Sequence, residues 1–83
     1  DISPKAPTHI LVIPRAHVPS LNQVESASLA GELLLMAAAV ARAEGIAESG
    51  YRVILNTNAD GGQTVYHLHA HVMGGRAMDW PPG

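Results

Sequence analysis

The chain contains no cysteine. It can therefore form no disulfide, and it offers no thiolate for nucleophilic catalysis or zinc binding. The lack of disulfides is compatible with a reducing compartment. The chain opens Asp-Ile-Ser-Pro, with neither the basic start nor the apolar segment of a secretion signal. We therefore expect a cytoplasmic setting.

Basic residues are also scarce, since five Lys and Arg face seven Asp and Glu, for a formal net charge of −2. This balance argues against a basic surface for nucleic acid or for an anionic membrane. No apolar run approaches the roughly 18 residues that span a bilayer. With 83 residues the chain is sized for one small domain, over 1–83, whose thin stability margin oligomerisation often supplements.

The residue pattern predicts an α+β domain with an antiparallel sheet and one long helix. The β-branched run 8–14 ends at a proline and reads as a strand, and its apolar residues on both faces predict a central position. A helix is expected over 29–44, with Ser26 or Ser28 as the N-cap and Gly45 as the C-terminal stop. A short helical turn is expected over 21–24.

The expected helix is apolar over more than one face. Its primary stripe, at spacings of three and four, consists of Leu29, Leu33, Met36 and Val40. A helix lying on a sheet needs only this stripe. The wider arc indicates a second contact, such as a partner subunit, because small apolar residues let helices approach closely. The residues of the wider arc are Leu34, Leu35, Ala37, Ala38, Ala39 and Ala41.

Two further strands are expected in the second half, over 51–56 and 64–73. Between them, 57–63 is rich in turn formers, with Asp60-Gly61, the dipeptide of tight hairpins, at its centre. The later strand reads His-Leu-His-Ala-His-Val-Met over 67–73. Alternate side chains of a strand share a face, so the histidines would line one side and the apolar residues would face a core. The histidines are His67, His69 and His71, and the core residues are Leu68, Ala70 and Val72.

Three explanations fit such a row of histidines. In a metal site, His67 and His71 would lie about 13 Å apart on a straight strand, too far to share one ion, so His9 or His17 would have to help. For the second shell of such a site, only Asp60 and Asp79 stand out as carboxylates. Alternatively, the histidines have no chemical role. This is the default for one histidine but less convincing for three in strict alternation.

The third explanation is nucleophilic catalysis. A neutral imidazole is a good nucleophile toward phosphorus and a good leaving group afterwards, and neighbouring imidazoles can orient it and carry protons. The turn 60–64, Asp-Gly-Gly-Gln-Thr, lies just upstream. Its glycines would let backbone N–H groups approach an anion, Thr64 adds a hydroxyl and Asn56 offers an amide. The residues alone therefore allow a phosphoryl-transfer site.

The segment 67–73 matches the His-φ-His-φ-His-φ-φ signature of the histidine triad superfamily, where φ is an apolar residue. The flanks, over 1–9, 11–14, 60–66 and 74–83 with its Trp-Pro-Pro-Gly ending, resemble the histidine triad nucleotide-binding (Hint) branch. The resemblance implies a homodimer whose sheets join into one ten-stranded sheet. It also implies hydrolysis of purine nucleoside 5′-phosphoramidates, in which AMP is linked to an amine, without a metal or cofactor. It further implies that the helix and strand usual at the front of the domain are missing here.

Carried over residue by residue, the resemblance makes His69 the nucleophile that forms a nucleotidyl-imidazole intermediate. His71 would contact the phosphate, while His67 and His9 would orient the nucleophile and relay the proton to the departing amine. Thr64 stands where the family usually has serine, which keeps the hydroxyl. The implied nucleotide contacts, with Asp1 at the ribose and Ile2 at the base, are Asp1, Ile2, Asn56, Gly62, Gln63, Thr64, His69, Ala70 and His71.

Two other functions stay open. One is a related enzyme that cleaves dinucleoside polyphosphates, for which Lys5 and Arg76 are the only nearby cations. The other is a nucleotide-binding or scaffold protein without significant turnover. His17 is expected to be a loop or surface histidine, and Trp80 is expected to anchor the tail to a core, to a dimer partner or near the active site.

Overall fold

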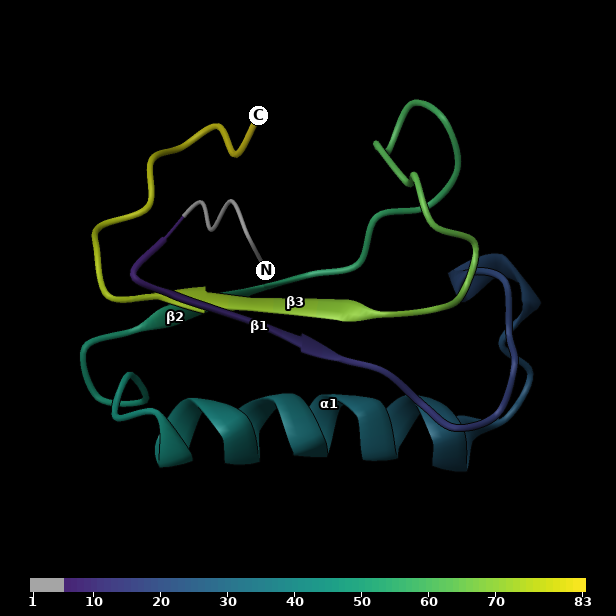
Figure 1. The fold of residues 1–83 in the computed structure, drawn as a ribbon, viewed down its shortest axis with the longest axis horizontal. Coiled ribbons are helices and arrows are strands. Elements are labelled where there is room, and N and C mark those ends of the chain that lie inside the picture. Colours follow the sequence, from purple (N-terminus) through teal and green to yellow (C-terminus); the bar gives the residue numbers. More distant parts are fainter. Residues whose placement is uncertain (1–5) are drawn as a thin grey trace.

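A three-stranded antiparallel sheet with one long helix along one face forms the framework of the protein (Figure 1). The structure is a computed structural model that describes residues 6–83. The strand order is β1-β3-β2, so the last strand in the sequence lies in the middle. The predicted α+β class is confirmed. The elements are β1 (Thr8–Val12), the 3-10 helix η1 (Leu21–Gln23), α1 (Ala27–Ala43), β2 (Tyr51–Ile54) and β3 (Ala70–Gly74).

Local signals determine where α1 begins and ends. The hydroxyl of Ser26 accepts a hydrogen bond from the Leu29 N–H at 3.1 Å, which satisfies one of the free donors at the start of the helix. At the other end, Gly45 takes a φ of 75°, a left-handed conformation that suits glycine. The predicted cap and stop are confirmed. No helix within residues 6–83 is both long and apolar enough to cross a bilayer.

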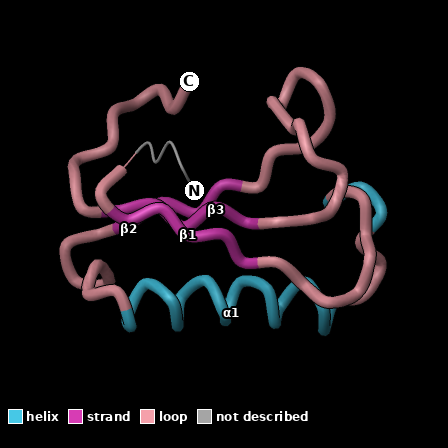
Figure 2. Tube along the Cα trace, in the orientation of Figure 1, coloured by secondary structure: helices cyan, strands magenta, loops and turns pink. Residues whose placement is uncertain are grey.

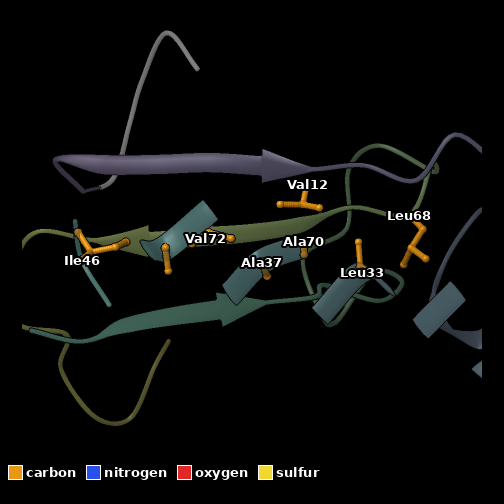
Figure 3. Packing of buried hydrophobic residues seen from close by; sticks show 8 residues of the cluster. Val12, Leu33, Ala37, Ile46, Leu68, Ala70 and Val72 are labelled. Atoms are coloured by element: carbon orange, nitrogen blue, oxygen red, sulfur yellow. The ribbon is translucent and has the colours of Figure 1, made fainter. Parts of the chain in front are cut away.

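The core lies between α1 and the sheet (Figure 3). Leu33, Ala37 and Ala41, four residues apart, form the buried stripe of α1. Two of these three are alanines, so the helix can lie close to the strands. The alternation predicted around the histidines is confirmed for its apolar half, which is buried in this core. The cluster comprises Val12, Leu33, Ala37, Ala41, Ile46, Leu68, Ala70 and Val72.

The predicted helix stripe was wrong in one member. Met36 is 53% exposed, and Ala37 and Ala41, assigned to the wider arc, take the core positions. The reason is geometric: positions 33, 37 and 41 follow the buried line of the helix, whereas Met36, about 100° around the helix from Ala37, lines a groove with the end of β1. Leu34 and Leu35 are exposed at 53% and 71%.

The run 8–14 is not a central strand in the part of the chain that the structure describes. It ends as a strand at Val12, and β1 lies at one edge of the sheet. Its residues do point to both faces, but the face away from α1 is less covered there, and Leu11 is exposed. A β-branched composition reports strand conformation and does not report how many neighbours the strand has.

The histidine-bearing strand is also shorter than predicted. The ladder begins at Ala70, so 64–69 lies outside the sheet, and we call this segment the histidine arm. The turn at Asp60-Gly61 forms, but the first β2–β3 pair is Ile54 with His71, so the connection is a long loop and not a tight hairpin. Figure 2 shows this loop on the side of the sheet opposite α1. A Cβ at Gly61 would collide with the Thr57 carbonyl, which explains the glycine.

Replacing Ala37 with leucine tests the close helix–sheet packing. Ala37 is 1% exposed, so extra methyl groups must displace the sheet or the helix. We expect Ala37→Leu to lower the free energy of unfolding by about 1–3 kcal/mol in urea titrations. Ala39→Leu on the exposed side of α1 is the matched control, with an expected change within about 0.5 kcal/mol. Equal effects of the two changes would contradict this packing.

Candidate active site

His71 occupies the middle of the site because its strand has a neighbour on each side. It pairs across the sheet with Leu11 of β1 and Ile54 of β2, and its side chain lies on the face away from α1. His9 of β1 pairs with Met73, one step diagonal to His71 on the same face. His9 Nε2 lies 2.8 Å from His71 Nδ1, and the ring centroids are 5.1 Å apart. The two strands thus join two imidazoles by a hydrogen bond.

His69 stands one residue before β3, and its proton position follows from its partner. Its Nδ1 lies 2.7 Å from the backbone oxygen of His67. A carbonyl oxygen only accepts, so Nδ1 must carry the hydrogen. In the neutral ring the lone pair is then on Nε2, which is available for attack. The His69 and His71 ring centroids are 5.0 Å apart, so the free nitrogen belongs to a ring beside the His9–His71 pair.

His67 faces the loop between β1 and η1, which we call the connector, residues 13–20. Its Nε2 donates to the Pro14 oxygen at 3.1 Å. The ring of His17 meets it edge-on, with centroids 5.1 Å apart and an interplanar angle of 89°. His17 is an exposed loop residue, as predicted, but its contact with His67 was missed. Fifty positions separate the two residues, and only the path of the connector brings them together.

All five histidines of the chain therefore lie in one row. Three rings, those of His9, His71 and His69, are in contact, and the backbone oxygen of His67 links them to the His67–His17 pair. Within residues 6–83, no three His, Asp or Glu side chains are placed to hold one metal ion. The arrangement can hold and pass protons next to one free imidazole nitrogen.

The residues predicted to bind phosphate differ in whether their polar groups are available to a ligand. Continuing the β2–β3 register beyond its last pair places Asn56 opposite His69. Thr64 is exposed at the start of the arm, and its hydroxyl has no hydrogen bond to the rest of residues 6–83. The Ala70 side chain is buried toward α1, so only its backbone can reach a ligand.

The two other loop residues already use their donors. The Gly62 N–H donates to Ala59, and the Gln63 side chain is buried and hydrogen-bonded on both of its polar atoms. Asp1 and Ile2 lie outside the described residues.

Burial lowers the pKa of His71 below its ordinary value of 6.5, and the nearby His69 and His9 lower it further. Removing water penalises the charged ring, and a positive charge on a neighbouring ring repels it. The neutral form of His71 is therefore favoured in the folded protein. The unfolded chain binds the proton more readily, so this residue makes stability fall as the pH drops below 6.5.

The His71→Asn variant tests this linkage. We expect wild type to lose unfolding free energy between a pH above 6.5 and one below it, and the variant to lose less, because asparagine does not titrate. Urea titrations at the two pH values measure the difference. An equal loss in both proteins would mean that other groups set the pH dependence.

Comparison with known proteins places this geometry in a family. The family model for the HIT domain matches residues 1–78. The chain is 54% identical over 80 residues to the purine nucleoside phosphoramidase of Escherichia coli, covering 94% of this chain and 67% of that protein. It is 52% identical over 85 residues to an uncharacterized HIT-like protein of Synechococcus elongatus, covering 100% of this chain and 74% of that protein.

Solved structures agree with the sequence comparison. The crystal structure of a HIT family hydrolase from Legionella pneumophila superposes with a TM-score of 0.96 at 49% identity, covering 100% of this chain and 76% of the other. A HIT family hydrolase from Clostridium thermocellum gives a TM-score of 0.90 at 42% identity, covering 95% and 70%. The resemblance seen in the histidine motif and its flanks is thus confirmed: the chain belongs to the HIT domain, or histidine triad, family of hydrolases.

Proposed function

We propose that this chain hydrolyses the P–N bond of purine nucleoside 5′-phosphoramidates through a covalent intermediate on His69. The observation that carries the proposal is the 2.7 Å bond from His69 Nδ1 to the His67 oxygen, which leaves Nε2 as the nucleophilic nitrogen. The relative in Escherichia coli, 54% identical, is named a purine nucleoside phosphoramidase, which supports the substrate class.

In the first step, His69 Nε2 forms a bond to phosphorus while the P–N bond breaks. The electron pair of that bond goes to the amine nitrogen, which takes up a proton and leaves. The chain of imidazoles from His9 through His71, with His67 on the other side of His69, can supply that proton. A neutral His71 suits this place. The His69 ring gains positive charge when it bonds to phosphorus, and a charged His71 beside it would repel that charge.

In the second step, water attacks phosphorus and gives a proton back to the imidazoles that supplied one to the amine. The bond to His69 Nε2 breaks, which releases the nucleoside monophosphate and restores the ring. We assign the phosphoryl oxygens to His71, to the Asn56 amide, which the continued register places opposite His69, and to the exposed Thr64 hydroxyl at the start of the arm. Asp1 and Ile2 would hold the ribose and the base. No metal or cofactor enters either step.

A homodimer is part of the proposal. Met36 lines a groove of about 430 Å³ with the end of β1, so Leu34, on the other flank of α1, points toward the β2 edge. Within residues 6–83, Leu34 is 53% exposed and β2 has a strand neighbour on one side only. An exposed apolar residue beside an unpaired strand suits a second copy joined through β2.

The lack of cysteine supports the proposed cytoplasmic setting.

The nucleophile is tested by turnover of an adenosine 5′-phosphoramidate with EDTA present. We expect wild type to be active and His69→Ala to lose about a thousandfold or more of its kcat, because no other group replaces the attacking nitrogen. AMP should still bind to the variant, which controls for folding. Rapid-quench mass spectrometry should trap a nucleotidyl adduct on wild type only.

Three results would contradict this assignment. AMP binding without turnover by wild type would indicate a binding module. A preference for dinucleoside polyphosphates would indicate the other enzyme class. Activity lost only with EDTA would indicate a metal-dependent reaction.

The dimer is tested by measuring the mass in solution by light scattering. We expect wild type to have the mass of a dimer. Leu34→Glu should shift the equilibrium toward the monomer, because a carboxylate buried without a partner is costly. Leu35→Glu is the matched control, since Leu35 points away from both the sheet and the β2 edge. A monomeric wild type, or equal effects of the two changes, would refute this interface.

A further inference from the structure

Within residues 6–83 the histidine arm has no ladder partners; Leu68 packs in the core, and two hydrogen bonds join the arm to the connector. The Leu68 N–H donates to the Val18 oxygen at 2.7 Å. His67 Nε2 donates to Pro14, and the His17 ring packs on His67. The position of His67 and His69 therefore depends on the burial of Leu68 and on how firmly the arm is attached to the connector.

Gln63, just before the arm, makes a further attachment. Its side-chain Nε2 donates to the Pro19 oxygen at 2.8 Å and to the Val65 oxygen at 3.1 Å. Its Oε1 accepts from the Asn58 N–H at 3.0 Å. One carboxamide thus joins three segments: the turn before it, the connector and the arm.

Every N–H of Gln63 is used in these contacts. The backbone N–H donates to the Asn58 oxygen at 3.0 Å, and the two Nε2 hydrogens are taken by Pro19 and Val65. The residue is only 7% exposed. A phosphate accepts hydrogen bonds and donates none when ionised, so Gln63 has nothing left to offer it in this arrangement.

Breaking these bonds has a cost localised at the arm. Without the amide, the carbonyls of the exposed residues Pro19 and Val65 would take water in place of their donor, and the link between the connector and the arm would be lost. β3, held by β1 and β2, does not depend on this side chain. Loss of the amide should therefore release the arm before it affects the sheet.

We propose that Gln63 is a positioning residue that clamps the histidine arm to the connector and thereby fixes His67 and His69, and that its side chain does not bind phosphate. The kinetic consequence rests on the proposed hydrolysis through His69. The clamp itself can be measured without substrate.

Amide hydrogen exchange of the full 83-residue chain, without ligand, tests the clamp. Gln63→Met keeps the side-chain length and removes the hydrogen bonds. We expect exchange at the Leu68 amide to rise about tenfold or more, with a change below about threefold at the Val72 amide in β3. Asn22→Leu makes a comparable amide-to-apolar change in η1, at an exposed residue whose side chain has no hydrogen bond within residues 6–83, and we expect it to leave Leu68 within about threefold of wild type.

Kinetics supply the readout that a purely structural role would not move. In Gln63→Met we expect kcat for the phosphoramidate to fall about tenfold while KM stays within about threefold, because the nucleophile is misplaced and the phosphate contacts remain. Thr64→Val should show the opposite pattern, with Leu68 exchange unchanged and KM raised. Thr64→Ser should restore KM.

If Gln63→Met does not fold, Gln63→Glu replaces it, since a carboxylate keeps the acceptor and loses both donors. Unchanged Leu68 exchange with weakened AMP binding would overturn the proposal and make Gln63 a phosphate ligand. Equal acceleration of Leu68 and Val72 would overturn it in favour of general stability. Faster Leu68 exchange in a protein whose wild type shows no turnover would support the clamp and refute the proposed hydrolysis alone.

Discussion

The site depends first on the register of β3 between its two neighbours. With Leu11 and Ile54 opposite His71, the imidazole points away from α1, and the diagonal neighbour His9 comes within 2.8 Å of it. A slip of one residue would turn His71 into the core and expose Val72. The fully buried Ala70 and Val72 make that slip costly, so the hydrophobic core on one face of the sheet holds the histidines on the other face in place.

The sequence predicts the parts of this structure that short-range chemistry determines. Ser26 and Gly45 mark the helix ends because a cap and a left-handed residue are needed there whatever else the chain does. The alternation over 67–73 correctly separated a core side from a polar side. The same alternation did not reveal where the ladder begins, because β2 ends at Ile54 and leaves the arm without a partner on that side. Periodicity describes the faces of a segment and not its neighbours.

The site residues divide in the same way. Histidines two positions apart can be grouped from the sequence, whereas the contact of His17 with His67 depends on the path of the connector. Gln63 shows a further limit. A polar residue in a glycine-rich turn looks like a ligand for an anion, and only the structure shows that its donors already have acceptors. The HIT family model covers the residues of the row and of the arm alike, so the family match supports the site as a whole without separating these roles.

The hydrogen bond between His9 and His71 has a consequence for how protons can be stored. When both rings are neutral, one nitrogen of the facing pair carries the hydrogen and the other must be bare. If His9 Nε2 donates, His71 Nδ1 is bare and the hydrogen of His71 is on Nε2. If His71 Nδ1 donates, His71 Nε2 is bare. The two rings can therefore change tautomer only together, as a coupled switch with two settings. In one setting His71, the ring beside His69, has a hydrogen-bond donor at Nε2, and in the other it has an acceptor there.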